Sequence, residues 1–340
     1  MSLPKFFHAP ARMDAAIDKA LAERRIVGAV VLAAHQGRII HRRAAGYANR
    51  ETLTPMREDA IFRLASITKP IVTAAAMRMV EQGRLDLHAP VTTWLPGFRP
   101  ALPDGTRPQI AIHHLLTHTS GIGYGFLEPS DGPYHRLNVS DGLDQPGLSL
   151  PENLARLGAA PLAFAPGAGW RYSLGIDVLG GILERLEDRS LGDIVRDAVA
   201  TPLDLADTDF SVRDTTRLAE AYADGNPEPV PMTDGMQVPL FDTAACFAPS
   251  RILNPRSYPS GGAGMAGTAG DVLRFLEAIR AAADELTNTP AICRKSYVHD
   301  TIVTAFEDGI LERFAATMGG YRTQSKREQL LAQVVMAAGA

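Results

Sequence analysis

The 340-residue sequence predicts an α+β fold with multi-domain α and β character. Two β-branched runs within residues 27–40 predict a hairpin, and several other stretches carry apolar residues at helical spacing. The hydrophobic content of 46% lets the chain bury a large core, either as one large domain or as two intimate ones.

The N-terminal elements follow in order along the chain. Residues 13–21 have apolar positions at helical spacing and predict a helix, and the hairpin comes next with residues 35–38 as its turn. Residues 71–81 are rich in Ala and Met, contain no helix breaker and follow Pro70. They predict a largely buried helix that ends near Gly83.

The middle of the chain mixes loops with helices. Between residues 90 and 166, short helical stretches alternate with connections rich in proline and glycine, notably residues 95–108 and 121–151. Irregular loops of this length in a compact protein are usually functional or lid-like. Amphipathic patterns predict helices at residues 174–186 and 191–200. A glycine-dense segment then leads into a predicted helix at residues 271–282, with Thr268 as its cap.

Charge and cysteine content exclude several classes of protein. The formal net charge is −4, and the 34 basic residues are scattered, so we expect no nucleic-acid partner. Cys246 and Cys293 are too few for a disulfide framework, and no Cys/His spacing matches a closed zinc site. Residues 1–10 contain no apolar run of signal-peptide length and nothing later approaches a membrane span, which predicts a soluble, cytoplasmic protein. A secreted form whose leader was removed before this numbering stays open.

The central chemical signal is a serine three residues before a lysine, Ser66 and Lys69, at the start of the helix predicted for residues 71–81. This spacing places both side chains on one helical face. A serine hydroxyl is a poor nucleophile until a base takes its proton, and a neutral lysine can be that base. The Ser66–Lys69 spacing alone is a weak signal of catalysis, because Ser2 and Lys5 have the same spacing. A helix cap beside a solvated lysine is the alternative.

Tyr172 is the second candidate, in a turn at residues 166–173 that precedes a predicted helix. A phenol close to a lysine is closer to ionisation and can relay a proton between nucleophile and leaving group. The alternative is an aromatic side chain at an interface, beside a serine that caps the helix.

Four motifs in this order resemble the serine β-lactamase and penicillin-binding protein superfamily, and most closely the β-lactamase-like family VIII carboxylesterases. The resemblance covers about residues 13–282. The motifs are Phe62-Arg63-Leu64-Ala65-Ser66-Ile67-Thr68-Lys69, residues 112–121 (IHHLLTHTSG), residues 166–173 (PGAGWRYS), and residues 260–265 (SGGAGM) followed by Gly267-Thr268-Ala269 before Asp271.

The resemblance implies an antiparallel sheet flanked by helices, with an additional mainly helical region. Residues 1–80 and 241–340 would form the α/β region and residues 81–240 the helical region, with the active site in the cleft between them. It implies no cofactor and no metal ion. His114 and His118, four residues apart, could lie on one helical face as metal ligands, but no third ligand is evident, and the resemblance makes them structural.

The resemblance also implies that an ester acylates Ser66, with Lys69 and Tyr172 as its activating partners, and that water releases the acyl group. Leu174 stands where lactamases have an asparagine, which favours a short-chain carboxylesterase acting on small-molecule esters. The substrate-binding candidates are Tyr124, Phe126, Trp170, Gly262 and Gly264. Other aromatic residues could line an acyl pocket or belong to the core: Trp94, Phe98, Tyr134 and Phe164.

The tail departs from the family pattern. Members carry a late strand that supplies a second oxyanion donor, and the nearest candidate, residues 317–321 (TMGGY), follows a helical pattern from Ser296 onward. The tail after about residue 291 is therefore atypical: a truncated or frame-altered end, a fusion, or a divergent member with a rebuilt edge. Loss of one donor would lower the rate by about two to three orders of magnitude, leaving weak, Ser66-dependent activity.

Two kinds of alternative function remain at this point. The same site could serve an acyltransferase, a weak β-lactamase or a D-amino-acid peptidase, depending on which group accepts or leaves the acyl group. A non-catalytic binding or sensor protein with an acylatable serine is the alternative from another class. The sequence does not predict the oligomeric state.

Overall fold

The computed structural model describes residues 9–144, 147–241 and 243–285. The chain divides into two compact units: one contains residues up to 238 together with 245–275, and the other contains residues 239–244 and those from 276 onward. All the candidate site residues belong to the first unit. The division of the chain at residues 80 and 241 stays a prediction.

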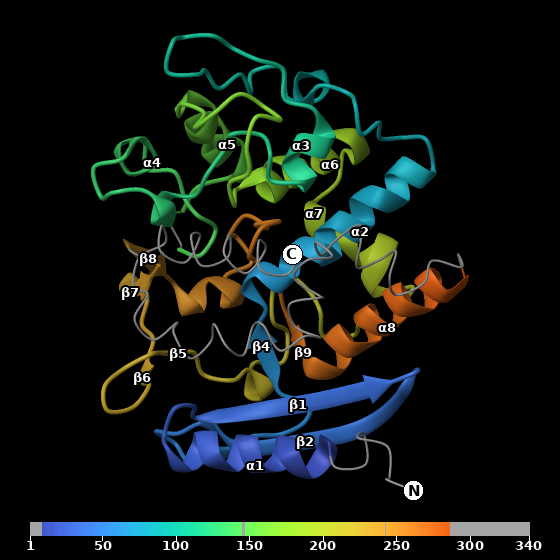
Figure 1. The fold of residues 1–340 in the computed structure, drawn as a ribbon, viewed down its shortest axis with the longest axis vertical. Coiled ribbons are helices and arrows are strands. Elements are labelled where there is room, and N and C mark those ends of the chain that lie inside the picture. Colours follow the sequence, from blue (N-terminus) through green and yellow to red (C-terminus); the bar gives the residue numbers. More distant parts are fainter. Residues whose placement is uncertain (1–8, 145–146, 242, 286–340) are drawn as a thin grey trace, which may run out of the picture. The chain divides into compact units, whose positions relative to one another are not determined.

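The N-terminal helix and hairpin are confirmed. Helix α1 (Ala9–Ala22) is followed by strands β1 (Gly28–His35) and β2 (Arg38–Asn49), which pair antiparallel and form a sheet with the short β3 (Thr54–Pro55). Figure 1 shows α1 lying along this hairpin. Arg43 of β2 binds Asp14 of α1, with 2.9 Å between Nη1 and Oδ1, which attaches the helix to the strands.

A short strand leads into the helix that carries the lysine. Strand β4 (Ile61–Arg63) pairs antiparallel with β9 (Ala266–Thr268), and a 3-10 turn (Ala65–Ile67) connects β4 to α2 (Thr68–Glu81). The predicted helix is therefore confirmed, but it begins three residues earlier. Pro70 is tolerated in the first turn because the N–H that proline lacks would have no intrahelical acceptor there.

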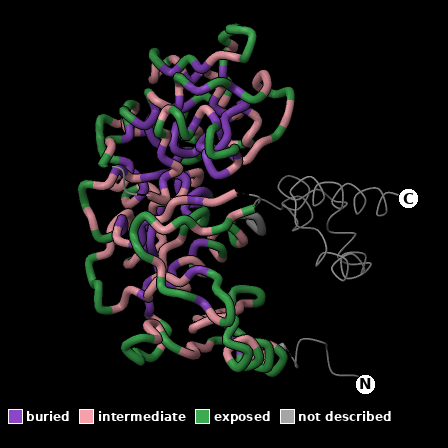
Figure 2. The backbone as a smooth tube through the Cα atoms, turned by 90° about the vertical axis from the view of Figure 1, so that its left-hand side faces the viewer, coloured by how far each residue is buried: buried purple, intermediate pink, exposed green. Residues whose placement is uncertain are grey.

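Helix α6 (Gly175–Glu187) forms the centre of the helical part. Its residues 175–183 are all buried, and α2, α3 (Ile112–Leu116), α5 (Leu150–Ala159) and α7 (Leu191–Val195) pack against it. Figure 2 shows buried backbone gathered here, whereas the residues of β1, and those of α1 that the structure describes apart from Ile17, are partly or fully exposed. The helix predicted at residues 191–200 is α7 continued by a π-helical turn (Arg196–Ala200).

The remaining elements are short. They are the 3-10 helices Val91–Thr93, Gly125–Leu127, Thr215–Arg217 and Pro249–Leu253, helix α4 (Pro133–Arg136), and strands β5 (Tyr222–Ala223), β6 (Val230–Pro231), β7 (Met236–Leu240) and β8 (Thr243–Phe247). Strand β5 pairs with β6, and β7 pairs with β8.

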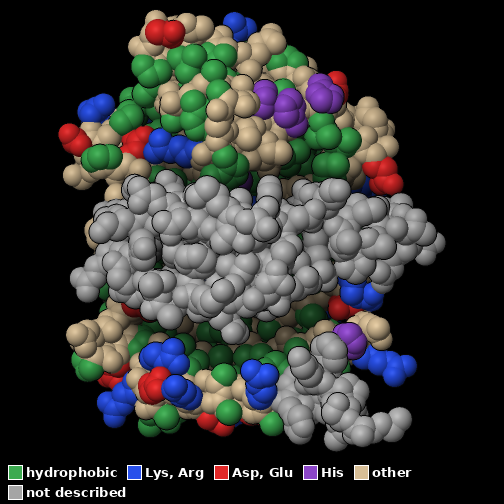
Figure 3. Space-filling model, in the orientation of Figure 1, with side chains coloured by type: hydrophobic (Ala, Val, Ile, Leu, Met, Phe, Trp, Pro, Cys, Tyr) green, Lys and Arg blue, Asp and Glu red, His purple; other side chains and the backbone are tan. Residues whose placement is uncertain are grey.

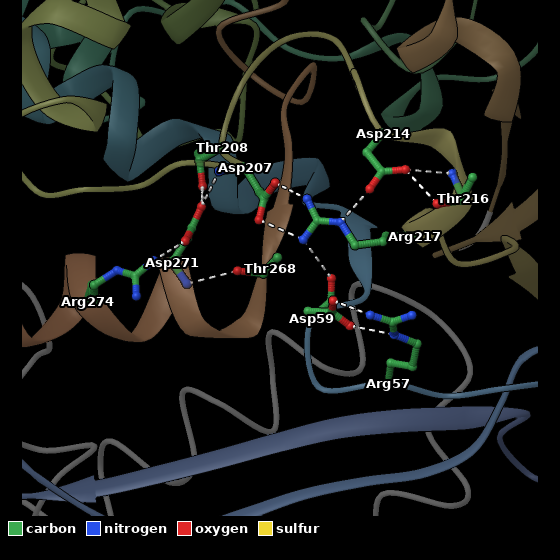
Figure 4. Close-up of polar contacts among 10 residues, drawn as sticks. All are labelled: Arg57, Asp59, Asp207, Thr208, Asp214, Thr216, Arg217, Thr268, Asp271 and Arg274. Atoms are coloured by element: carbon green, nitrogen blue, oxygen red, sulfur yellow. Dashed lines mark hydrogen bonds and ion pairs between the residues drawn. The ribbon is translucent and has the colours of Figure 1, made fainter.

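The junction of β9 with α8 (Ala269–Glu285) confirms the predicted cap. Thr268 Oγ1 accepts a hydrogen bond from the backbone N–H of Asp271 at 3.1 Å. The Asp271 carboxylate accepts hydrogen bonds from the Asp207 backbone N–H and from Thr208 Oγ1, both at 2.9 Å (Figure 4). The start of α8 is thus attached to the loop that precedes Arg217.

Predictions for the C-terminal tail fall outside the described residues. They concern Cys293, the helical pattern from Ser296 onward and the motif at residues 317–321. Within the described ranges, no helix is long and apolar enough to cross a membrane.

Candidate active site

Ser66 lies where β4 gives way to helical backbone. The Leu64 N–H donates to Met265 O at 2.8 Å, so the approach to Ser66 runs beside the segment that precedes β9. Ala65 has a φ of +43°, a left-handed conformation that is uncommon for a residue with a Cβ atom and costs free energy. This backbone leaves Ser66 exposed at the start of a helical turn.

Lys69 approaches Ser66 from the first turn of α2, as the three-residue spacing predicts. Its Nζ lies 3.2 Å from Ser66 Oγ and donates to Gly262 O at 2.8 Å. The side chain is buried, and its amine lies 4.5 Å from the ring centre of Tyr172 and 5.3 Å from that of Tyr124. The Lys69 amine is therefore surrounded by two aromatic rings and one carbonyl oxygen, and it lies within hydrogen-bond distance of Ser66 Oγ.

Tyr172 reaches the same serine from another part of the chain. Its phenolic oxygen lies 2.6 Å from Ser66 Oγ. The turn that carries it is attached on both sides: the Arg171 N–H donates to His118 O at 2.9 Å, and the Leu174 N–H donates to Gly123 O at 3.1 Å. Residues more than 100 positions apart thus meet at one hydroxyl.

His118 lies behind Tyr172 and next to Lys69. Its Nδ1 is 2.9 Å from Ser173 Oγ, and its ring centre is 5.0 Å from that of Tyr172. Burial, and then the charge of Lys69, lower the pKa of His118 to about 4. The imidazole is therefore neutral at pH 7, and it supports the tyrosine without adding positive charge near the lysine.

A buried carboxylate is linked to the lysine through one loop. Asp177 of α6 is 0% exposed, and its Oδ1 accepts from Ser260 Oγ at 2.7 Å. Ser260 Oγ in turn accepts from the Ala263 N–H at 3.2 Å, which fixes the loop that presents Gly262 O to Lys69. Burial raises the pKa of Asp177, and the hydrogen bond from Ser260 opposes this shift.

Sequence reasoning did not single out Asp177. The available signal was one acidic residue within an otherwise apolar helical stretch, residues 174–183. The position of Gly262 shows why that loop is rich in glycine. A Cβ atom there would lie 2.4 Å from Asp177 Oδ2 and 2.9 Å from the Tyr124 hydroxyl, so a side chain has no room.

The predicted substrate-binding residues lie at different depths. Tyr124 is 2% exposed, with its ring centre 5.2 Å from that of Tyr172, and Phe126 stacks behind it at 4.5 Å. Trp170 is 67% exposed and forms a T-shaped pair with His118, with 6.1 Å between ring centres. Gly264 ends the loop that binds Lys69 and lines a neighbouring cavity.

The other aromatic candidates contact other parts of the fold. Trp94 and Phe98 border a different cavity, between the loop after α2 and helices α5 and α6. The Tyr134 hydroxyl accepts from the Gly123 N–H at 2.8 Å, and the ring is buried. Phe164 packs beside Gly169. Leu174 is fully buried at the start of α6.

The histidine pair does not share a helical face. Helix α3 ends at Leu116, and His118 has a φ of +57°, so the chain has already left the helix. His114 Nδ1 instead accepts from the Ala111 N–H at 3.1 Å. Figure 3 shows histidine side chains gathered on one face, but the described part of the chain holds no group of three His, Cys, Asp or Glu side chains able to bind a metal ion.

With this geometry in place, the chain can be compared with known proteins. A model of the family described as Beta-lactamase matches residues 13–331. The chain belongs to the beta-lactamase family. The match extends past residue 291, where the tail departs from the motif pattern, but the third-motif candidate at residues 317–321 lies outside the described residues.

The relatives include esterases and acyltransferases. Esterase EstB of Burkholderia gladioli is 56% identical over 274 residues, which are 80% of this chain and 70% of that esterase. Monacolin J acid methylbutanoyltransferase of Aspergillus terreus is 31% identical over 231 residues, 62% of this chain and 54% of that enzyme, so the chain spans about half of that relative's length.

One solved structure shares the fold closely. EstCE1, a hydrolase with promiscuous acyltransferase activity, matches with a TM-score of 0.78 at 46% identity, over 83% of this chain and 73% of its own. The predicted β-lactamase-like fold, with helices and antiparallel sheets, is thereby confirmed.

Proposed function

We propose that this protein is a carboxylesterase of the β-lactamase-like family VIII kind, which hydrolyses small carboxylic esters through an acyl-enzyme on Ser66. The observation that carries the proposal is that two proton-transferring groups converge on one hydroxyl. Lys69 Nζ lies 3.2 Å and the Tyr172 phenolic oxygen 2.6 Å from Ser66 Oγ. The names of EstB and EstCE1, an esterase and a hydrolase, support the same reaction class.

Acylation begins when Ser66 Oγ attacks the ester carbonyl carbon. The hydroxyl proton passes to the Lys69 amine, directly or through Tyr172, and the carbonyl oxygen becomes an oxyanion. When the tetrahedral intermediate collapses, the bond between the carbonyl carbon and the alcohol oxygen breaks, and the departing alkoxide takes up the proton. The products of this half-reaction are the free alcohol and an ester of Ser66.

Deacylation repeats these steps with water as the nucleophile. The same groups take a proton from water, hydroxide adds to the acyl carbon, and Ser66 Oγ leaves and recovers its proton. The first N–H groups of a helical turn lack intrahelical acceptors, so the Ser66 N–H at the start of its 3-10 turn is suited to bind the oxyanion.

The chemical environment favours esters over amides as substrates. An amide nitrogen is a poorer leaving group and needs a well-placed proton donor and polar contacts. Leu174 occupies the position where lactamases have an asparagine, and its side chain is fully buried, so it offers no such contact. We therefore propose short acyl esters as substrates and little β-lactam hydrolysis.

Hydrolysis of p-nitrophenyl butyrate by wild type and Ser66→Ala tests the proposal, with nitrocefin assayed on the same preparations. The expected result is ester turnover that is lost with Ser66, with little nitrocefin cleavage. Ser2→Ala is the matched control, since Ser2 has the same spacing to a lysine. One acyl adduct without repeated turnover would favour the non-catalytic sensor, and Ser66-independent turnover would reject the site.

Acyl transfer is a second candidate activity, favoured by the acyltransferases among the relatives. An alcohol would then replace water as the acceptor. Addition of a primary alcohol should convert part of the acyl product from acid to ester without changing the release of p-nitrophenol in the first half-reaction. Free acid as the sole product at high alcohol concentration would restrict the protein to hydrolysis.

A further inference from the structure

A cavity of about 270 Å³ lies in the first unit, separate from the aromatic residues around Tyr172. Its wall includes the apolar side chains of Phe62, Leu143, Phe247, Ile252 and Met265. Ile252 and Met265 are buried, whereas the other three are only partly covered by protein. Ligand pockets in proteins typically enclose about 300–1,000 Å³, so the space suits a small apolar group.

The wall of this cavity is continuous with the catalytic site. Ala65, the residue before Ser66, lines it, and so does Ala263, which follows the glycine whose carbonyl binds Lys69. The two wall segments run side by side, joined by the hydrogen bond from Leu64 N to Met265 O. The cavity therefore adjoins both the chain segment that carries Ser66 and the loop that binds Lys69.

The polar side chains on the wall are already bonded to the protein. Arg63 donates to Pro249 O at 2.8 Å and to Ala219 O at 2.9 Å. Arg251 donates to Asp144 O and Tyr258 O, both at 2.6 Å. Glu220 accepts from the Ala221 N–H at 3.2 Å. The surface left for a ligand is therefore mainly apolar.

We propose that this cavity binds the acyl chain of the substrate and that, among short acyl esters, the protein prefers those whose unbranched aliphatic chain reaches into the cavity. The inference rests on the proposed function of Ser66. The acyl group, unlike the alcohol, stays attached to Ser66 Oγ after the first half-reaction, so its chain must occupy space that adjoins this residue. Each methylene group removed from water stabilises the bound state by about 0.8 kcal/mol, or about 4-fold in kcat/KM.

The test compares two substrate series with wild-type protein and two variants. In one series the acyl chain of p-nitrophenyl esters grows from acetate through butyrate and hexanoate to octanoate. In the other, the alcohol of an acetate ester grows in the same steps. Leu143→Trp reduces the cavity, and Leu253→Trp is its matched control, because Leu253 is 45% exposed and does not line the cavity.

We expect wild-type kcat/KM to rise by about 4-fold per methylene along the acyl series until the cavity is full. Leu143→Trp should lower kcat/KM for the octanoate ester at least about 10-fold more than kcat/KM for the acetate ester. Phe247→Ala, which enlarges the space, should move the optimum to longer acyl chains. Circular dichroism of each variant checks that it is folded.

Other outcomes separate the two proposals. If all variants hydrolyse the acetate ester through Ser66 but acyl length has no effect, or if Leu143→Trp changes only the alcohol series, the acyl pocket is rejected and the esterase stands. If Leu253→Trp lowers kcat/KM for the octanoate ester as much as Leu143→Trp does, the effect does not come from the cavity. If no ester is hydrolysed by folded wild-type protein, the proposed function fails first.

Discussion

At the scale of single residues, Ser66 Oγ has two neighbours that can transfer a proton: Lys69, which is buried, and Tyr172, which is half-buried. Lys69 is 8% exposed and bonded to a carbonyl, so its amine has a fixed direction. Tyr172 is held by main-chain bonds on both sides of its turn. Such fixed geometry is what general acid–base catalysis requires.

Replacement of Lys69 should remove the proposed base. We expect Lys69→Ala to lower kcat/KM for p-nitrophenyl butyrate by about 10²–10⁴-fold. Lys69→Arg should be equally impaired, because a guanidinium does not release its proton in proteins. Lys19→Ala, at a side chain that is 69% exposed, is the control and should behave as wild type. Full activity in Lys69→Arg would show that no proton passes through this residue.

We expect His118 to make the free energy of unfolding sensitive to acid. Its folded pKa of about 4 lies below the usual value of 6.5, because burial and Lys69 disfavour the charged form. Between these values the unfolded chain binds more protons, so the free energy of unfolding falls as the pH is lowered from about 6.5 to 4. Urea unfolding of wild type and His118→Gln at several pH values measures this. Between pH 6.5 and 4, the free energy of unfolding should fall more for the wild type than for His118→Gln. If the two proteins show the same dependence on pH, His118 is not its cause.

At the scale of elements, one loop connects the core of the helical part to the site. The loop at residues 260–264 contacts Asp177 of α6 through Ser260 and Lys69 of α2 through Gly262. A carboxylate 0% exposed on a central helix thereby positions the amine that faces Ser66.

Removal of this carboxylate should alter activity through the loop. Asp177→Ala leaves the Ser260 hydroxyl without its acceptor and should cost about 1–3 kcal/mol in the free energy of unfolding. Displacement of Gly262 by about 1 Å could cost up to about 10²-fold in kcat. Asp177→Asn keeps one acceptor for Ser260, so it should lose less in the free energy of unfolding and less in kcat than Asp177→Ala. Equal kcat in all three proteins, measured under conditions where each is folded, would show that the carboxylate has only a structural role.

The start of α8 provides a separate test of the fold. Thr268→Val keeps the shape of the side chain but removes the oxygen that accepts from the Asp271 N–H. Loss of such a cap costs about 1 kcal/mol. Chemical unfolding should show this loss, while Thr54→Val, at an exposed position in β3, should not. An unchanged midpoint for Thr268→Val would mean that Asp271 alone stabilises this end of the helix.

At the scale of the whole molecule, local patterns predicted local structure well. Helical periodicity predicted α1, two β-branched runs predicted the β1–β2 hairpin, and an Ala- and Met-rich composition without a breaker predicted α2. The spacing of Ser66 and Lys69 predicted their contact because both lie at one helix start. The convergence of Tyr172 on that pair came from a family resemblance, because no spacing relates residues 106 positions apart.

The parts that sequence reasoning missed depend on tertiary packing. Asp177 and Ser260 are 83 positions apart, and neither has a local signal of their contact. The aromatic candidates looked alike in sequence, yet Tyr124 lies against Lys69 while Trp94 and Phe98 border another cavity. His114 and His118 matched a helical spacing that α3 is too short to provide.

The most direct test of the whole account is the site of acylation. Wild type and Ser66→Ala are mixed with p-nitrophenyl butyrate, quenched in acid during turnover and digested, and the peptide that contains residue 66 is examined by mass spectrometry. We predict a butyryl adduct on Ser66 in the wild type and none in Ser66→Ala, which also has no turnover. A butyryl adduct on another residue, or undiminished turnover in Ser66→Ala, would contradict the account.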